Sequence, residues 1–101
     1  MKNIVLICAV GMSTSMLVVQ MKDAMKAMGV NCEISAHSMS LVKKVGQDAD
    51  IILLGPQVAF ELKKVQTMFP NIPVKVIDMK DYGMMDGKAV MKMVANTISI
   101  A

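Results

Sequence analysis

The sequence predicts a single α/β domain over residues 1–101, in which a four-stranded parallel sheet is covered by helices on both faces. Short apolar runs alternate with longer segments of helical periodicity along the chain. One run, Ile51-Ile52-Leu53-Leu54, is apolar throughout, as expected for a strand that is buried on both faces. The chain has 101 residues, 54% of them hydrophobic and 19% charged, which suffices for one packed core without disulfides.

Four short apolar runs are predicted to form the strands, and they cover residues 3–7, 31–36, 51–54 and 74–77. The second run alternates apolar with polar residues, which is the pattern of a strand that turns one face to the core. Cys32 lies on the apolar side of this run, so we interpret it as a small core residue. Pro73 leads into the fourth run, and a proline is tolerated at the start of a strand.

The segments between the runs show helical spacing. Apolar residues recur on one stripe from Leu17 to Met28, and Gly29 is placed to end that helix as a C-terminal cap. Three further elements are expected: a short turn or helix around residues 40–45, a helix from Pro56 that ends before Pro70, and a last helix capped by Asp86 that carries Val90, Val94 and Ile98.

This alternation implies right-handed crossovers and the strand order 2-1-3-4, a flavodoxin-like three-layer sandwich that resembles the small tyrosine phosphatases. Ligands in such sheets bind beyond the carboxyl ends of the strands, where the strand order reverses. The first strand flanks that point, and Cys8 follows directly after it. A thiol is therefore expected at the place where this fold binds its ligands.

The composition excludes several classes of function. All eleven basic residues are lysine, the net charge is +3, and one tyrosine with no tryptophan offers little to stack on nucleic-acid bases. No apolar run approaches the roughly 20 residues that span a bilayer, and the apolar stretch after Met1-Lys2 is too short for a secretory signal. We expect a cytoplasmic protein that binds no nucleic acid and inserts into no membrane. Its two cysteines fit neither a CxxC redox motif nor a zinc site.

Cys8 opens the segment Cys8-Ala9-Val10-Gly11-Met12-Ser13-Thr14-Ser15, a small, hydroxyl-rich connection between a strand and a helix. Backbone N–H groups and the positive end of a helix dipole converge in such a connection, so an anion bound there would touch the sulfur. Gly11 lets the backbone approach the anion, and the hydroxyls of residues 13–15 are further donors. Because a thiolate attacks phosphorus and a helix N-terminus favours thiolates, the segment indicates a cysteine that carries a phosphoryl group.

The spacing also invites comparison with the tyrosine-phosphatase loop, C-x5-R-[ST]. Thr14 stands where the arginine belongs, and the chain has no arginine. Phosphatases hold the phosphate oxygens with a bidentate guanidinium, which lysine replaces poorly. Asp81 and Asp86, the candidate acids for hydrolysis, are interpreted as a turn residue and a helix cap. A phosphoryl carrier is therefore favoured. The alternatives are an arginine-less phosphatase-like enzyme, a regulatory module switched by phosphocysteine, and an inert cysteine at the end of a strand.

Three motifs follow one another over nearly the whole chain: the segment from Cys8 to Ser15, close to C-x-x-G-M-S-T-S; Leu53-Leu54-Gly55-Pro56-Gln57; and Val76-Ile77-Asp78 with Tyr82-Gly83-Met84-Met85-Asp86-Gly87. In this order and spacing they resemble enzyme IIB of the lactose/cellobiose family of the bacterial phosphoenolpyruvate-dependent sugar phosphotransferase system.

The resemblance implies a phosphocarrier. Cys8 would match the family's phosphorylated cysteine, which takes a phosphoryl group from a phosphohistidine on enzyme IIA and passes it to a sugar held by the membrane component, enzyme IIC. Its phosphate-binding loop would match Ala9, Val10, Gly11, Met12, Ser13, Thr14 and Ser15. No metal or organic cofactor is implied. The sugar stays open among β-glucosides, cellobiose, chitobiose and lactose, and a monomer is expected because the cysteine has to face two partners in turn.

Further residues are expected at the periphery of the site. Gly55, Pro56 and Gln57 follow the third strand, and Tyr82 is expected in a loop at the same end of the sheet. The amide of Gln57 would bind phosphate, a partner or water, and Tyr82 would shield the phosphocysteine or pack under the loop. His37 is interpreted as an exposed residue at the end of the second strand, with a role in docking as the alternative.

Methionine is unusually frequent, with 13 residues. Met21, Met25 and Met28 fit the core stripe of the first helix, so binding of copper(I) by the scattered thioethers is disfavoured. Loops at the expected active-site end contain the remaining group of interest, Met12, Met84 and Met85. Thioether side chains adapt to different surfaces, so we expect this group to form a docking surface for two successive partners.

Overall fold

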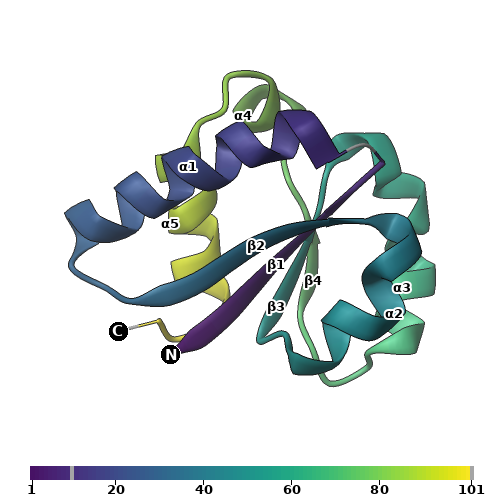
Figure 1. The fold of residues 1–101 in the computed structure, drawn as a ribbon. Coiled ribbons are helices and arrows are strands. Elements are labelled where there is room, and N and C mark those ends of the chain that lie inside the picture. Colours follow the sequence, from purple (N-terminus) through teal and green to yellow (C-terminus); the bar gives the residue numbers. More distant parts are fainter. Residues whose placement is uncertain (10, 101) are drawn as a thin grey trace.

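The computed structural model of the chain describes residues 1–9 and 11–100, and at residues 11–14 it describes the backbone alone. Its four strands form one parallel sheet in the order β2-β1-β3-β4, which confirms the predicted topology (Figure 1). The strands are β1 (Lys2–Cys8), β2 (Cys32–Ser38), β3 (Ile51–Leu54) and β4 (Val74–Val76). Strand β1 is therefore central, and its carboxyl end lies beside the carboxyl ends of β2 and β3.

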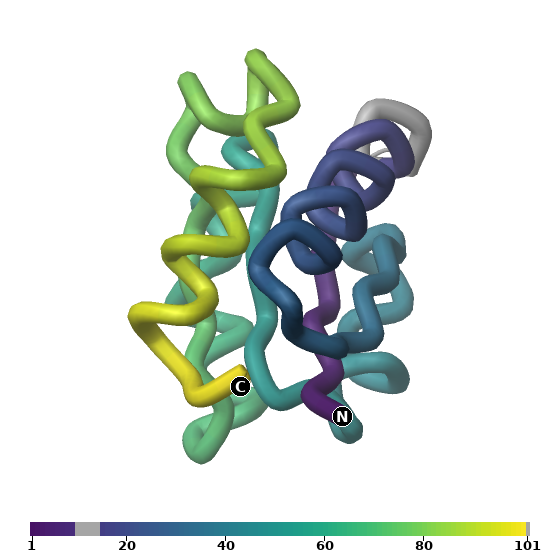
Figure 2. Tube along the Cα trace, turned by 90° about the vertical axis from the view of Figure 1, so that its left-hand side faces the viewer, coloured from purple at the N-terminus to yellow at the C-terminus, as the bar shows by residue number. Residues whose placement is uncertain are grey.

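Helices cover both faces of the sheet, and the two longest lie side by side on one of them (Figures 1 and 2). That face has α1 (Gly11–Met28) and α5 (Gly87–Thr97), with the short α4 (Met79–Gly83) directly after β4. The other face has α2 (Val42–Val45) and α3 (Leu62–Met68), with the 3₁₀ turns η1 (Met39–Leu41), η2 (Gly46–Asp48) and η3 (Pro56–Glu61). The expected short element around residues 40–45 is thus confirmed as η1 followed by α2.

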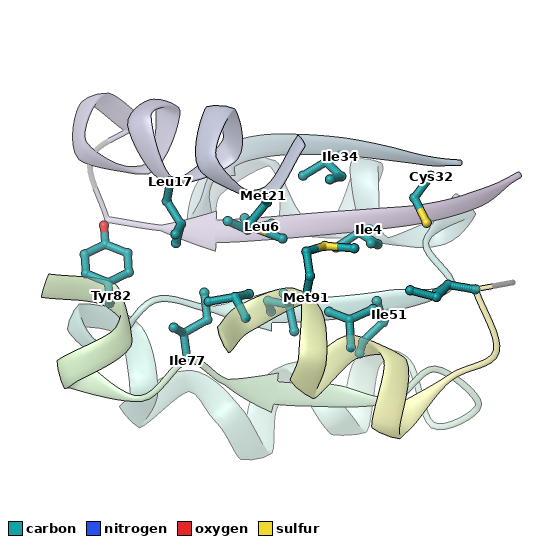
Figure 3. Close-up of a cluster of buried hydrophobic side chains, with 14 residues drawn as sticks. Ile4, Leu6, Leu17, Met21, Cys32, Ile34, Ile51, Ile77, Tyr82 and Met91 are labelled. Carbon is teal, nitrogen blue, oxygen red and sulfur yellow. The ribbon is translucent and has the colours of Figure 1, made fainter. Parts of the chain in front are cut away.

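Alternation along β1 divides the core into two clusters. Ile4 and Leu6 face α1 and α5, whereas Val5 and Ile7 face α2 and α3. Figure 3 shows the first of these clusters between the sheet and the helices. Each cluster removes large aliphatic side chains from water, which is the main favourable term in folding. As a result, the strand that ends at Cys8 is held by packing on both sides.

Helix α1 ends as the sequence predicts. Gly29 has φ 72°, a left-handed conformation that glycine adopts without a steric penalty. Its N–H donates to the Lys26 carbonyl at 3.1 Å, and the Val30 N–H donates to the Met25 carbonyl at 3.3 Å. These two bonds are the Schellman closure, which satisfies carbonyls that the last turn of a helix leaves without partners.

Two helix boundaries differ from the prediction. The segment from Pro56 begins as the 3₁₀ turn η3, because Val58 has φ −116° and ψ 21°, and regular α-helix begins only at Leu62. The last helix ends at Thr97, and Ile98 is extended, with φ −133° and ψ 158°. The Ile98 side chain still packs against the first core cluster, so the apolar period persists although the backbone has left the helix.

The two ends of the described chain lie together at the edge of the fold where β1 begins (Figures 1 and 2). They therefore lie at the amino ends of the strands, whereas Cys8 lies at the carboxyl end of β1. Among the elements of residues 1–9 and 11–100, no helix combines the length and the hydropathy needed to cross a bilayer.

The close approach of α1 and α5 makes a prediction about stability. A Cβ atom on Gly87 would overlap the backbone of Gln20 and Met21 in α1, and a backbone cannot move aside as a side chain can. Gly87→Ala is therefore expected to lower the free energy of unfolding by about 1–3 kcal/mol. Urea denaturation of the variant and of the unmodified chain measures this difference.

Gly83→Ala is the matched control. At Gly83 a Cβ atom would meet nothing within 4 Å in the described part of the chain. We expect its free energy of unfolding to stay within about 1 kcal/mol of the parent, with a gain if anything, because alanine is the better helix former. Equal destabilisation by the two substitutions would show that the contact between α1 and α5 does not cause the loss of unfolding free energy in Gly87→Ala.

Candidate functional site

Cys8 is the last residue of β1 and is completely buried, with 0% of its surface exposed. It pairs with Ser38 of the neighbouring strand β2. Its thiol donates a hydrogen bond to the His37 carbonyl oxygen, with 3.9 Å between sulfur and oxygen. Neither Cys8 nor Cys32 is in a disulfide. The thiol therefore lies at the carboxyl edge of the sheet, between the two strands that flank β1.

Three of the residues predicted for the site periphery converge beside Cys8. Gly55 follows β3, and its N–H donates to the Ile7 carbonyl at 2.8 Å. A Cβ atom placed on Gly55 would lie 3.6 Å from Cys8 Cβ and 3.5 Å from Tyr82 Cε1. It would also lie 2.9 Å from the Gln57 side-chain oxygen. The absence of a side chain at Gly55 therefore leaves the space in which Cys8, Tyr82 and Gln57 approach one another.

Tyr82 lies in a helix, and the prediction that it lies in a loop was wrong. It belongs to α4 and is buried, and Figure 3 shows its hydroxyl directed toward the carboxyl end of β1. Helix α4 begins because the Asp78 carboxylate accepts the N–H groups of Lys80 at 2.8 Å and Asp81 at 3.4 Å. The signal was present in the sequence, since an aspartate directly after a strand is a frequent N-cap.

The predicted phosphate-binding segment is mostly helical. Helix α1 already begins at Gly11, because a connection of two residues suffices to join a strand to a helix packed on it. The first N–H groups of an α-helix have no acceptor within the helix, and its positive dipole end lies there, close to the end of β1 (Figure 1). Ala9 and Ser15 are exposed, whereas Val10 and the side chains of Met12, Ser13 and Thr14 lie outside the described residues.

His37 acts on Cys8 through its backbone. It lies near the end of β2, one residue before Ser38, as expected, but it is half-buried, so the interpretation that it is exposed was wrong. The His37 ring nitrogen Nε2 lies 3.1 Å from the Ser35 hydroxyl oxygen. That contact holds the imidazole against β2, while the His37 carbonyl accepts the hydrogen bond from the Cys8 thiol.

The Asp86 carboxylate and the Asp81 backbone carbonyl both form hydrogen bonds at the connection between α4 and α5. Asp86 caps α5 as predicted, with its carboxylate accepting the Ala89 N–H at 3.0 Å. Asp81 lies in α4 rather than in a turn, and its carbonyl accepts the Asp86 N–H at 2.8 Å. Both residues therefore shape the connection between α4 and α5.

An apolar groove of about 550 Å³ adjoins this site, and it is lined by Pro56, Gln57, Met79, Tyr82, Gly83 and Met85. Because Gln57 and Tyr82 belong to both, the groove and the surroundings of Cys8 are continuous. Met79 and Met84 are strongly exposed, with 76% and 67% of their surfaces accessible. Met84 borders a second groove between α1 and the start of α5, and Met85 lines both grooves. Met12 belongs to α1 rather than to a loop, and its side chain lies outside the described residues.

Cys32 is a core residue, as predicted. It belongs to the cluster under α1 and α5, and its N–H donates to the Met25 sulfur at 3.0 Å. Burial raises the pKa of the Cys32 thiol above its ordinary value of 9.0, although the positive charge of the chain's amino terminus opposes that shift. Within residues 1–9 and 11–100, no three histidine, cysteine or acidic side chains gather in a way that would hold a metal ion.

The fold and the site together define a class of small open-sheet α/β domains, in which the central strand ends in a cysteine beside a helix N-terminus. Such an arrangement is suited to holding an anionic group on sulfur. The sequence profile of one family, "PTS system, Lactose/Cellobiose specific IIB subunit", matches residues 3–93, and the chain belongs to that family. It is accordingly a phosphotransferase component of the sugar phosphotransferase system (PTS).

Relatives with sugar-specific names cover most of the chain. The "PTS system oligo-beta-mannoside-specific EIIB component" of Bacillus subtilis is 46% identical over an alignment of 91 positions, which covers 87% of each chain. Galactose-specific and cellobiose-specific EIIB components of Lactococcus lactis are each 39% identical over alignments of 105 positions, gaps included, which cover 97% of each chain.

Solved structures agree with the fold. The lactose-specific IIB component domain of Streptococcus pneumoniae superposes with a TM-score of 0.84 over 94% of this chain and 95% of that one, at 13% identity. The cellobiose-specific IIB component of Borrelia burgdorferi gives a TM-score of 0.77 at 35% identity, over 94% of this chain and 89% of that one.

The raised pKa of Cys32 predicts how stability depends on pH. In the unfolded chain this thiol loses its proton near its ordinary pKa of 9.0, whereas the folded chain retains the proton. The unfolded state then binds fewer protons, so the contribution of Cys32 to stability is present below pH 9 and is lost as the pH rises through the pKa of the folded state. Cys32→Ala is expected to abolish this contribution.

Urea denaturation of the parent and of Cys32→Ala at pH 8 and at pH 10 provides the measurement. The other titrating groups are common to both proteins, so the difference between their free energies of unfolding isolates Cys32. We expect the advantage of the parent to be smaller at pH 10 than at pH 8. A difference that is independent of pH would contradict the assignment.

Proposed function

We propose that this chain is the phosphocarrier of a sugar phosphotransferase system, and that Cys8 is the residue that carries the phosphoryl group. The observation that supports this most directly is the position of Cys8, at the end of β1 where the first turn of α1 begins. Only there among the described residues does a thiol adjoin the amino end of a long helix, where amides and the helix dipole stabilise an anion.

The first half-reaction is transfer from a phosphohistidine on enzyme IIA. The Cys8 sulfur, as a thiolate, attacks phosphorus in line with the leaving nitrogen, so that an S–P bond forms as the N–P bond breaks. The thiol proton is released and the leaving imidazole takes up a proton, which balances the charge. Phosphoryl transfer needs positioning and stabilisation of charge more than covalent assistance, and the amides at residues 9–15 are the groups that would supply both.

The second half-reaction delivers the phosphoryl group to a sugar held by the membrane component, enzyme IIC. A sugar hydroxyl oxygen attacks phosphorus, the S–P bond breaks, the hydroxyl loses its proton and the Cys8 thiolate is regenerated. The carrier is then ready for another cycle without any cofactor. In this proposal the protein works in the cytoplasm, as a monomer, and reaches the inner face of the membrane only through enzyme IIC.

Cys8 has to move before the first half-reaction. Its thiol is completely buried and donates to the His37 carbonyl, so the sulfur does not face solvent in the form described here. Loss of the proton removes the donor of that hydrogen bond, and the thiolate then gains by turning toward donors. The His37 carbonyl, which can only accept, would repel the thiolate and favour this turn.

The phosphatase-like alternative is weaker on chemical grounds. The chain has no arginine to hold the phosphate oxygens, and the carboxylate of one candidate acid, Asp86, caps α5. Hydrolysis also requires a positioned water and an acid for the leaving group. Reversible transfer requires neither, so it is the chemistry that these residues support.

In this proposal enzyme IIC, and not this chain, binds the sugar and determines which sugar is used. The names of the relatives include an oligo-β-mannoside, galactose and cellobiose, at similar levels of identity to this chain. One carrier architecture thus serves several sugars. We propose a sugar of the cellobiose, β-glucoside, chitobiose or lactose class, to which those names add oligo-β-mannosides and galactose.

Intact-mass spectrometry tests the carrier. The chain is incubated with phosphoenolpyruvate, the general phosphotransferase proteins and an enzyme IIA of the lactose/cellobiose class. We expect one phosphoryl group to be added to the parent and to Cys32→Ala, and none to Cys8→Ser, because a serine hydroxyl is a far weaker nucleophile near neutral pH. An adduct on Cys8→Ser would refute the assignment of the site. Turnover of an aryl phosphate instead would establish the phosphatase-like reading.

A further inference from the structure

Gly55 provides space beside Cys8 rather than backbone freedom. Its φ of −63° and ψ of 155° belong to the extended region, which any residue can adopt. A Cβ atom at this position would nevertheless lie 2.9 Å from the Gln57 side-chain oxygen, closer than real Cβ atoms approach other atoms. It would also lie 3.6 Å from Cys8 Cβ. The Gln57 amide therefore occupies the space that the missing side chain leaves next to Cys8.

The Gln57 side chain reaches this space although the residue is exposed. It belongs to η3, whose Val58 packs in the second core cluster, on the other face of the sheet from α1. No hydrogen bond joins the Gln57 side chain to another of the residues that the structure describes. Its amide, with an NH₂ group that donates and an oxygen that accepts, is therefore available to a ligand at the carboxyl end of β1.

Hydrogen-bond donors beside Cys8 come from both faces of the sheet. The first N–H groups of α1 lie on one face. The His37 carbonyl, which accepts the thiol, cannot donate and would repel a phosphoryl oxygen. In the apolar groove beside Cys8, Gln57 and Tyr82 are the lining residues with a side-chain donor, and Tyr82 packs on the same face as α1. Gln57 is thus the donor in this groove that comes from the other face.

The amide of Gln57 can turn its NH₂ group toward Cys8. Its oxygen is the atom next to Gly55, and half a turn about the last side-chain bond puts the nitrogen in nearly the same place. A phosphoryl group with about two negative charges accepts hydrogen bonds and would favour that orientation. Because the amide is neutral, it would hold the phosphoryl group less tightly than a guanidinium, which suits a group that has to be passed on.

We propose that the Gln57 amide donates a hydrogen bond to a phosphoryl oxygen on Cys8 and thereby stabilises the phosphorylated chain. The inference rests on the proposed function, and it selects one of the three ligands that the sequence left open for this side chain: phosphate, a partner or water. When the N–P bond on enzyme IIA breaks and the S–P bond forms, Gln57 neither gains nor loses a proton. It would therefore act on the equilibrium between phosphohistidine and phosphocysteine.

Gln57→Met tests the inference, because it retains the length of the side chain and removes its donor. Phosphorylated enzyme IIA and the variant are mixed at a fixed pH without phosphoenolpyruvate, and intact-mass spectrometry measures the phosphorylated fraction of each protein at equilibrium. We expect the equilibrium constant for transfer to Cys8 to fall about tenfold relative to the parent, as for loss of a hydrogen bond to a charged group. Gln57→Glu is expected to lower the constant further, because a carboxylate repels the phosphoryl group.

The equilibrium constant separates this role from docking. A side chain that only contacts enzyme IIA changes the rates of forward and reverse transfer by the same factor, so the ratio of the two rates stays as in the parent. The measurement is repeated at several dilutions, so that the constant refers to the separate proteins and not to their complex. Because Gln57 is exposed, both variants are expected to melt at the temperature of the parent.

Gln66 is the matched control. Like Gln57 it is exposed, but it lies in α3 and lines neither of the two grooves described above. Gln66→Met and Gln66→Glu are expected to leave the equilibrium constant unchanged. The side-chain amide NMR signals of the two glutamines give a second readout. When Cys8 of the parent is phosphorylated, we expect the Gln57 amide protons to move downfield and those of Gln66 to stay in place.

The outcomes separate this inference from the proposed function. If the parent chain accepts no phosphoryl group, the carrier function fails and this inference fails with it. If the parent is phosphorylated and Gln57→Met has the same equilibrium constant, the carrier function stands and this inference is refuted. Rates that fall equally in both directions would then assign Gln57 to docking, and unchanged rates would assign it to water. An equal fall of the constant in the Gln66 variants, or a Gln57 amide signal that phosphorylation does not move, would also refute it.

Discussion

Strand β1 is the constraint on which the rest of the structure depends. It is hydrogen-bonded to β2 on one side and to β3 on the other, and its residues from Ile4 to Cys8 are buried. The two core clusters meet across this strand. The Gly55 N–H that donates to the Ile7 carbonyl fixes the exit of β3 against it as well. Because shifting β1 would disturb both cores and both ladders, the strand that leads to Cys8 is held in place from both sides.

The site combines this fixed backbone with a thiol that donates to a neutral acceptor, the His37 carbonyl. Under the proposed function, the thiolate that attacks phosphorus would turn from that carbonyl toward the N–H groups at the start of α1. Such a device suits a carrier, which has to hold a reactive group out of water between two encounters. A hydrolase would instead need water beside the phosphorus.

Much of the fold could be predicted from local patterns. The fully apolar run Ile51–Leu54 predicted a central strand, and Gly29 predicted the end of α1, because each signal lies within a few residues of the element that it specifies. The early start of α1 at Gly11 was not predicted, since Ser13, Thr14 and Ser15 are equally common in loops and in first helical turns. Helix α4 was missed because a single turn shows no apolar period, although Asp78 was a visible cap.

The candidate site was predictable in its chemistry and less so in its geometry. Cys8 and the helix that follows it are adjacent in sequence, so their combination could be recognised directly. The approach of Tyr82 and Gln57 to the same point depends on Gly55 and on the packing of α4, which are tertiary features. The contact between Cys8 and the His37 carbonyl is set by the register of β1 on β2, and no local pattern of residues specifies that register.

The position of the chain ends has a consequence for how such domains can be joined. Both ends lie at the edge of the sheet where β1 begins, away from the edge that holds Cys8. A neighbouring domain tethered at either end would therefore lie on the side of the molecule opposite Cys8. Reactive faces on two linked domains could then meet only through a linker long enough to reach around the molecule, whose longest dimension is 33 Å. Linker length, rather than any change in the carrier, would decide whether such a fusion transfers groups within one chain or between chains.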